Sequence, residues 1–177
     1  GILAQAPVYH PILHAPDNTQ CTLDAMQLTE RPDGQYEVDL DAFEDAITER
    51  TRIFILCNPH NPVGRVFRNE ELAQMAEICL RHGLVICSDE IHCDLVFSGQ
   101  QHIPIACLAP EIAQRSITLL APSKTYNIAG FHCSVAVIPD KELRETYCAA
   151  GAGLVPRPGV MDYVAALAAY QHGDSWL

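Results

Sequence analysis

The stretch Arg52–Cys87, RIFILCNPHNPVGRVFRNEELAQMAEICLRHGLVIC, decides the fold. It opens with a continuous apolar run, Arg52–Cys57, which is typical of a strand covered on both faces. Apolar residues then recur at helical spacing, at Leu72, Met75, Ala76, Cys79 and Leu80. A second apolar run, Leu84–Cys87, predicts the next strand. This strand–helix–strand order predicts a right-handed crossover between two parallel strands.

The predicted helix carries both a start and a stop signal. Asn69 is interpreted as the N-cap, and Glu70 and Glu71 follow in the first turn, where carboxylates favour the helix dipole. Gly83 is expected just past the C-cap, where a residue without a side chain ends a helix most easily.

The rest of the chain repeats the alternation of short apolar runs and helical patterns. Further strands are expected at Gly1–Ala6, Ser116–Ala121 and Ser134–Ile138. Further helices are expected from Asp39 to about Arg50, over Asp140–Ala150, and from about Gly159 to Gln171. No linker rich in Pro, Gly or Ser interrupts the chain, so the pattern predicts one α/β domain with a mainly parallel sheet.

Composition narrows the classes of function. The 177 residues suffice for one sizeable core, and the net charge of −11 would repel a phosphate backbone, so we expect no nucleic-acid partner. No apolar run approaches the ~18 residues of a membrane helix. No two of the eight cysteines have C-x-x-C spacing, so we expect no metal site and interpret them as buried, reduced thiols of a cytosolic protein. No G-x-G-x-x-G turn supports a nicotinamide-dependent dehydrogenase.

Three polar segments each follow a predicted strand. They are Asn58–Gly64 (NPHNPVG), Ser88–Asp94 (SDEIHCD) and Pro122–Gly130 (PSKTYNIAG). Ligands of open α/β sheets bind beyond the carboxyl ends of the strands. The sequence therefore predicts a site built from these three segments.

Each candidate residue in these segments has two interpretations. Lys124 is either a solvated surface charge or an amine that condenses with an aldehyde cofactor. Asp89 either caps the next helix or pairs with a protonated pyridine nitrogen. Asn61 lies in a stretch of turn formers and could serve only the turn.

Two aromatic residues are equally ambiguous. His92 lies three residues after Asp89 and is either a satisfied structural residue or part of the site. Tyr9 follows an apolar strand and is either an amphipathic side chain at the edge of the core or a ring that stacks on a flat cofactor. Taken one at a time, the residues leave these alternatives open.

Together and in this order, the three segments resemble a known group of enzymes. The chain resembles fold-type I pyridoxal 5′-phosphate (PLP) enzymes of the class I/II aminotransferase group, and within it the PatB/MalY-type cystathionine β-lyases, which are carbon–sulfur lyases. The NPHNP and DEIH forms are typical of the lyase branch, and the resemblance covers nearly the whole chain. It implies the large PLP-binding domain of this fold type, a three-layer α/β/α arrangement around a mainly parallel sheet.

The resemblance also implies roles for individual residues. Lys124 would hold the cofactor as a Schiff base and later move protons. Asp89 would hold the pyridinium nitrogen, and Asn61 would bond the phenolic oxygen of the ring. Tyr9 would stack on the ring face, and Ser123 would help to bind the phosphate.

Two positions depart from the wider aminotransferase pattern. Many relatives carry a tyrosine that contacts the phenolic oxygen where this chain has His92. Many carry a phosphate-binding arginine where this chain has His132, whose role stays open. The lyase branch also tends to lack that arginine.

Members of the group are longer than this chain. The turn that cradles the phosphate is expected before Gly1, and the arginine that binds the substrate carboxylate is expected after Leu177. We therefore expect residues 1–177 to be the central part of the large PLP-binding domain, without the N-terminal segment and the C-terminal small domain. Alone, this piece is expected to bind PLP weakly and to be inactive.

The implied activity is a PLP-dependent β-elimination that releases thiol, pyruvate and ammonia from a sulfur-containing amino acid. The resemblance further implies a cytoplasmic homodimer. Two alternatives remain: an aminotransferase that uses the same lysine, and a non-catalytic regulatory protein that retains the fold.

Overall fold

In the computed structural model, the backbone of residues 1–177 is described, with every side chain except that of Asn18. The main sheet contains, in spatial order, β2 (Leu23–Gln27), β1 (Ile2–Ala6), β5 (Ile53–Cys57), β6 (Val85–Asp89), β7 (Ser116–Leu120) and β8 (Val135–Val137). A separate hairpin pairs β3 (Thr29–Glu30) with β4 (Tyr36–Glu37). The α-helices are α1 (His10–His14), α2 (Leu40–Asp45), α3 (Asn69–Arg81), α4 (Pro110–Ala113), α5 (Pro122–Thr125), α6 (Lys141–Gly151) and α7 (Val160–His172). Short 3₁₀ helices lie at Ala15–Asn18 and Ile105–Cys107.

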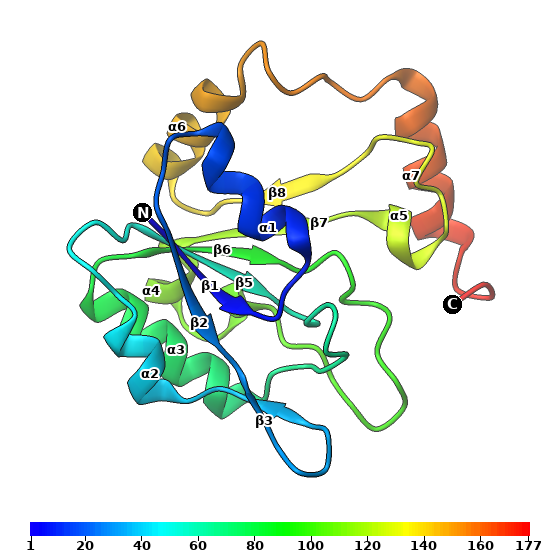
Figure 1. The fold of residues 1–177 in the computed structure, drawn as a ribbon. Coiled ribbons are helices and arrows are strands. Elements are labelled where there is room, and N and C mark those ends of the chain that lie inside the picture. The colour runs from blue at the N-terminus through cyan, green and yellow to red at the C-terminus, as the bar shows by residue number, and fades with distance from the viewer.

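The predicted parallel sheet is confirmed. Strands β2, β1, β5, β6 and β7 run parallel, and β8 joins β7 antiparallel at the edge. In the predicted crossover, Ile53 of β5 lies opposite Val85 of β6, and α3 connects the two strands. The carboxyl ends of the parallel strands therefore meet at one edge of the sheet, on the side where α5 lies (Figure 1).

Helices cover both faces of the sheet, as the three-layer prediction requires. Within β5, Phe54 and Leu56 belong to the larger core, which α2, α3 and α4 cover. Ile55 and Cys57 point to the other face and pack in a smaller core with Ile12 of α1. Figure 1 shows α2 and α3 on one side of the sheet and α1 on the other. The side-chain alternation along a strand explains why an unbroken apolar run serves both faces.

Two predicted helix boundaries were wrong. Asn69 is the first residue of α3 rather than its N-cap, because the Glu71 carboxylate reaches back to accept a hydrogen bond from Arg68 N at 2.9 Å. Helix α2 ends at Asp45, well before Arg50.

A tertiary contact accounts for the early end of α2. Thr51 Oγ1 donates a hydrogen bond to Asp24 Oδ2 at 3.0 Å and accepts one from Thr48 N at 2.9 Å. These bonds hold residues 48–51 as a turn against β2, and a helix cannot continue through it. Gly83 does follow α3 with a φ of +67°, as predicted for a residue without a Cβ.

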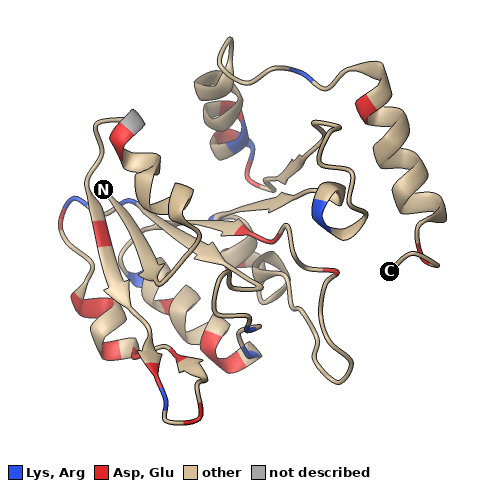
Figure 2. Cartoon of the chain, turned by 45° about the vertical axis from the view of Figure 1, so that its right-hand side comes forward, with Lys and Arg blue, Asp and Glu red and all other residues tan. Residues whose placement is uncertain are grey.

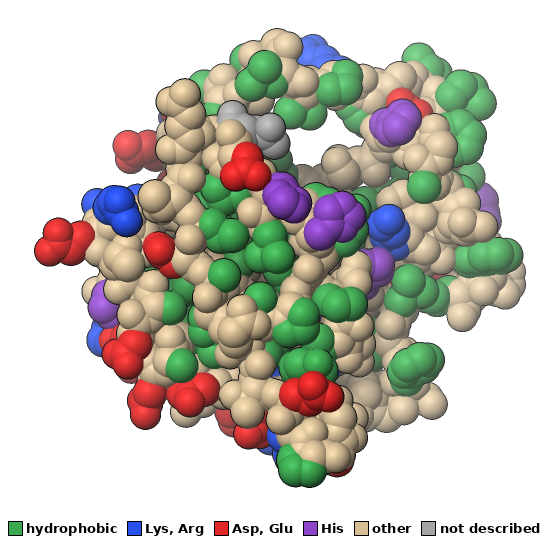
Figure 3. Space-filling model, in the orientation of Figure 1, with side chains coloured by type: hydrophobic (Ala, Val, Ile, Leu, Met, Phe, Trp, Pro, Cys, Tyr) green, Lys and Arg blue, Asp and Glu red, His purple; other side chains and the backbone are tan. Residues whose placement is uncertain are grey.

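Several elements of the surface are rich in acidic residues, and one helix is rich in exposed apolar residues. Acidic residues are spread over α2, α3 and the β3–β4 hairpin (Figure 2). Exposed hydrophobic side chains gather at the edge of the molecule formed by α7 (Figure 3). The exposed ones on this helix are Val160, Met161, Tyr163, Val164, Leu167 and Tyr170. None of the described helices is long and apolar enough to cross a membrane.

Candidate functional site

A small cavity of about 80 Å³ lies where the three polar segments meet. It is lined by Tyr9, Cys57, Asn61, Asp89, Ile91, His92 and Lys124. The lining brings together five of the predicted site residues from four separate parts of the chain. Ser123, the sixth, lies beside Lys124 on α5 but does not line the cavity, so its phosphate-binding role stays a prediction.

Lys124 reaches the cavity because α5 begins directly after β7. The strand ends at Leu120, and Pro122 starts the helix at a position where its missing N–H costs nothing. The side chain of Lys124 is exposed, so its amine is accessible to a small molecule.

Asp89 is the last residue of β6, and it is half-buried where it lines the cavity. Burial raises the pKa of its carboxyl, and the Ile91 amide and positive charge at His92 and Lys124 partly offset this rise. Among the described residues, Ile91 N donates the hydrogen bond recorded to this carboxylate, at 3.4 Å. The carboxylate therefore keeps capacity for a further, cationic partner.

The segment that follows β5 positions Asn61. His60 is buried, and its Nε2 donates to Pro7 O at 2.8 Å, which ties this segment to the one that carries Tyr9. Burial lowers the pKa of His60, which favours the neutral ring. Asn58 Oδ1 accepts from Phe67 N at 3.1 Å and closes the other end of the segment.

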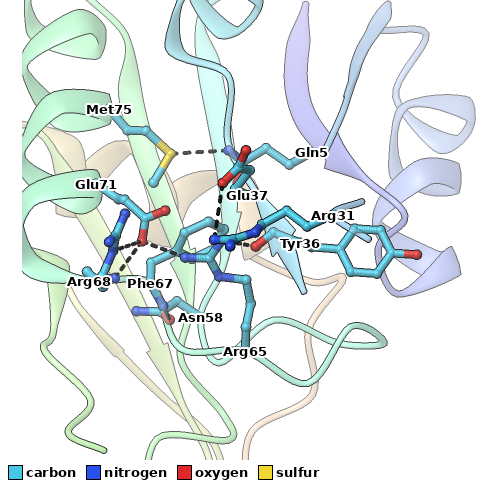
Figure 4. A network of polar contacts seen from close by, with 10 residues as sticks. All are labelled: Gln5, Arg31, Tyr36, Glu37, Asn58, Arg65, Phe67, Arg68, Glu71 and Met75. Atoms are coloured by element: carbon cyan, nitrogen blue, oxygen red, sulfur yellow. Dashed lines mark hydrogen bonds and ion pairs between the residues drawn. The ribbon is translucent and has the colours of Figure 1, made fainter. Parts of the chain in front are cut away.

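A charged network links the residues that follow this segment to α3 (Figure 4). The Arg65 guanidinium donates to Glu71 of α3 and to the Tyr36 carbonyl, and it lies 4.4 Å from the centroid of the Phe67 ring. Burial raises the pKa of Glu71, but hydrogen bonds from Arg68 N and from Arg65 outweigh that effect and leave the pKa lowered. The loop that presents Asn61 is thus anchored to the helix of the crossover.

A second buried carboxylate, Glu90, fixes the segment after β6. Glu90 is 0% exposed, and its carboxylate accepts from Ser88 Oγ at 2.8 Å, Ile105 N at 3.1 Å and His102 Nε2 at 2.8 Å. Asp89 and Glu90 are neighbours in the chain, but only Asp89 lines the cavity. Glu90 therefore holds the start of the loop that follows Asp89 and carries His92.

A larger groove of about 680 Å³ adjoins the cavity and shares Asn61 and His92 with it. The β3–β4 hairpin, the segment after β5 and the 95–100 segment form its walls. Among the described side chains, its lining includes Arg31, Arg65 and Arg68 but no lysine. We place the chemistry in the smaller cavity because Lys124 and Asp89 lie there.

The family model for aminotransferase class I and II matches residues 1–177, the whole chain. The chain belongs to the class I and II aminotransferase family. The family resemblance drawn from the NPHNP, DEIH and SKTYN segments is therefore confirmed.

Individual members of the family point to its lyase branch. The chain is 39% identical over 182 residues to cystathionine β-lyase PatB of Bacillus subtilis, covering 99% of this chain and 46% of PatB. It is 33% identical over 181 residues to protein MalY of Escherichia coli, covering 100% of this chain and 45% of MalY. Among solved structures, cystalysin from Treponema denticola, which contains a PLP cofactor, matches with a TM-score of 0.95 at 32% identity, covering 99% of this chain and 45% of cystalysin. The chain thus spans about half the length of these relatives.

Sequence reasoning missed several residues around the site. Cys57 and Ile91 line the cavity, although Cys57 had been interpreted only as part of a buried strand. Its place as the last residue of β5 was the available signal. Burial raises the pKa of the Cys57 thiol to about 11, so it stays protonated and shapes the cavity rather than acting as a nucleophile.

His132 lies outside the cavity, and its backbone N donates to Asp162 of α7 at 3.2 Å.

Proposed function

We propose that this chain forms the cofactor-binding face of a PLP-dependent carbon–sulfur β-lyase. The observation that carries the proposal is that Lys124, Asp89, Asn61 and Tyr9 line one cavity. Membership of the class I and II aminotransferase family supports PLP as the cofactor. Similarity to PatB and cystalysin supports the lyase branch.

The chemistry of the cavity fits this cofactor. Lys124 offers an accessible amine for an aldehyde, and Asp89 offers a carboxylate whose burial a cationic nitrogen would compensate. Asn61 offers an amide that can donate to a phenolic oxygen. Tyr9 offers a ring that is 43% exposed and therefore free to pack on another flat ring.

When bound, PLP supplies an aldehyde that captures amines and a pyridine ring that withdraws electrons from the carbon next to the captured amine. The Lys124 Nζ, once free, accepts the proton from the α-carbon of the substrate, which is a general-base role. The Asp89 carboxylate would accept a hydrogen bond from the protonated ring nitrogen and so favour the protonated ring. Asn61, Tyr9 and His92 would orient the ring, and Ser123 would add a hydroxyl for the phosphate.

The lining of the cavity contains no arginine among the described side chains. We propose that further segments of the protein supply the groups that clamp the phosphate and the substrate carboxylate, and that residues 1–177 form the central part of the large domain. A homodimer in the cytoplasm is part of the same proposal. The exposed apolar side chains of α7 provide a contact face that a further segment of the protein or a second subunit can cover.

Product analysis tests the lyase assignment. The full protein, loaded with PLP, is incubated with cystathionine, and pyruvate and free thiol are measured. A lyase releases both in equal amounts. An aminotransferase, the alternative that uses the same lysine, releases a keto acid that retains the sulfur and needs an amino-group acceptor.

Two variants make the experiment specific to the site. Lys124→Ala should abolish product formation, because the amine that moves the proton is gone. Lys141→Ala is the matched control, since Lys141 is the second lysine of this chain and its side chain on α6 is 79% exposed. Equal loss of activity in both variants would contradict the assignment of Lys124.

A further inference from the structure

A side-chain hydrogen bond joins two of the segments that carry the proposed cofactor contacts. Thr125 Oγ1 donates to Asp94 Oδ2 at 2.8 Å. Thr125 directly follows Lys124 on α5, and Asp94 lies two residues after His92 in the loop that follows β6. The Thr125 side chain is 3% exposed, so its hydroxyl is committed to this contact.

Helix α5 depends on tertiary contacts for its position and stability, because it is very short. It has four residues, and a helix of one turn has almost no stability of its own. At its C-terminal end, Tyr126 N donates to Pro122 O at 2.9 Å and Ile128 N donates to Ser123 O at 3.1 Å.

The other side of α5 rests on the C-terminal part of the chain. Trp176 Nε1 donates to Thr125 O at 3.0 Å. The ring of Tyr126 meets the edge of Tyr170 on α7, with centroids 5.9 Å apart. Contacts with α7 and Trp176 therefore hold α5 on one side. On the other side, Asp94 holds α5 to the loop that follows β6.

We propose that Asp94 is a positioning residue that acts through Thr125 to place the Lys124 amine at the cavity that Asp89 also lines. The inference rests on the proposed function, in which Lys124 holds the cofactor. Lys124 itself is exposed and has no ion pair recorded among the described residues, so the position of its backbone decides where the amine can reach. Asp94 lies outside the cavity lining and acts only through its neighbour.

Matched substitutions separate the hydrogen bond from the bulk of the side chains. Thr125→Val keeps the shape and removes the hydroxyl, whereas Thr125→Ser keeps the hydroxyl. Asp94→Ala removes the acceptor, whereas Asp94→Asn keeps an oxygen that can accept. Asp94 is exposed, so its substitution leaves the core intact and keeps the test usable if Thr125→Val folds poorly.

The readout is the rate at which each lysine is covalently labelled by PLP and borohydride in the full protein, resolved by peptide mapping. Thr125→Val and Asp94→Ala should each slow labelling of Lys124 by about ten- to a hundredfold, the effect expected when a reacting group is displaced by about 1 Å. Labelling of Lys141 should stay unchanged, and Thr125→Ser and Asp94→Asn should stay near wild type. The double variant Asp94→Ala/Thr125→Val should be no slower than either single variant.

A second readout needs no cofactor. Amide exchange of the peptide that spans residues 122–130 should be faster in Thr125→Val and Asp94→Ala than in the two conservative variants. The inference is overturned if Lys124 labelling is equal in all four variants, or if Thr125→Ser slows it as much as Thr125→Val. Labelling of Lys141 in place of Lys124 in the wild-type protein would instead defeat the proposed function, so the two failures are distinguishable.

Discussion

Replacing Glu90 with alanine tests whether this buried carboxylate holds the loop that follows β6. The carboxylate is fully buried and accepts from three donors, Ser88 Oγ, Ile105 N and His102 Nε2. In Glu90→Ala the serine hydroxyl can rotate to another acceptor, but the Ile105 amide and the His102 ring are left without one. Each stranded buried donor costs about 1–3 kcal/mol, so we expect a loss of about 4 kcal/mol.

Urea denaturation of the full protein measures this loss. With a slope of about 2 kcal/mol per molar urea, the midpoint should fall by about 2 M. Glu77→Ala is the matched control, because Glu77 is exposed on α3 and its removal should change stability by less than about 0.5 kcal/mol.

Glu90→Gln gives an intermediate test of the same reasoning. The amide oxygen of the glutamine can keep the hydrogen bonds from Ser88 and Ile105. Its amide nitrogen is a donor, so it can bond His102 Nε2 only if that atom carries no proton and the proton moves to Nδ1. His102 Nδ1 is buried without a partner among the described atoms, so this tautomer strands a proton there. The expected loss is about 1–3 kcal/mol, one stranded donor. If Glu90→Ala costs less than about 1 kcal/mol, Glu90 does not hold the loop as described.

The remaining predictions concern the charge at Asp89, the salt bridge of Glu71 and the core. Asp89→Asn should leave PLP binding detectable by absorption but slow turnover by orders of magnitude, because the ring nitrogen loses its anionic partner; near wild-type turnover would refute that role. The pKa of Glu71 is lowered in the folded protein. Its ionised carboxylate therefore stabilises the fold at pH values above 4.5, the ordinary pKa of a glutamate, and this stabilisation is lost as pH falls through the folded pKa. Urea midpoints of wild type and Glu71→Gln should therefore differ at pH 7 and converge in acid, and a constant difference would contradict this. Phe43→Ala should cost about 3–5 kcal/mol in the same assay, since its buried ring packs 4.8 Å from that of Phe54; a loss below about 1 kcal/mol would show that the core refills.

The parts of the fold that were predictable are those that local pattern determines. The apolar run of β5 and the 3.6-residue spacing of α3 require a buried strand and an amphipathic helix whatever surrounds them. Gly83 ended α3 as predicted, because the left-handed conformation there favours a residue without a Cβ. Clustering of Lys124 and Asp89 followed from the rule that parallel strands share a carboxyl edge.

The parts that could not be predicted depend on contacts between distant residues. The turn at residues 48–51 exists because Thr51 bonds Asp24, which lies 27 positions away. Nothing in the local sequence indicates that Glu90 is buried. Its burial depends on a donor distant in sequence, the Ile105 amide, which bonds its carboxylate. The β3–β4 hairpin is equally short of local signal, with two residues in each strand.

The most direct test of the account is the identity of the lysine that binds the cofactor. The full protein is incubated with PLP, reduced with borohydride and digested, and the modified peptide is identified by mass spectrometry. The account predicts covalent cofactor at Lys124, with no label on that peptide in Lys124→Ala. A label on Lys141 in place of Lys124, or none on either lysine, would contradict the central claim that this cavity holds PLP through Lys124.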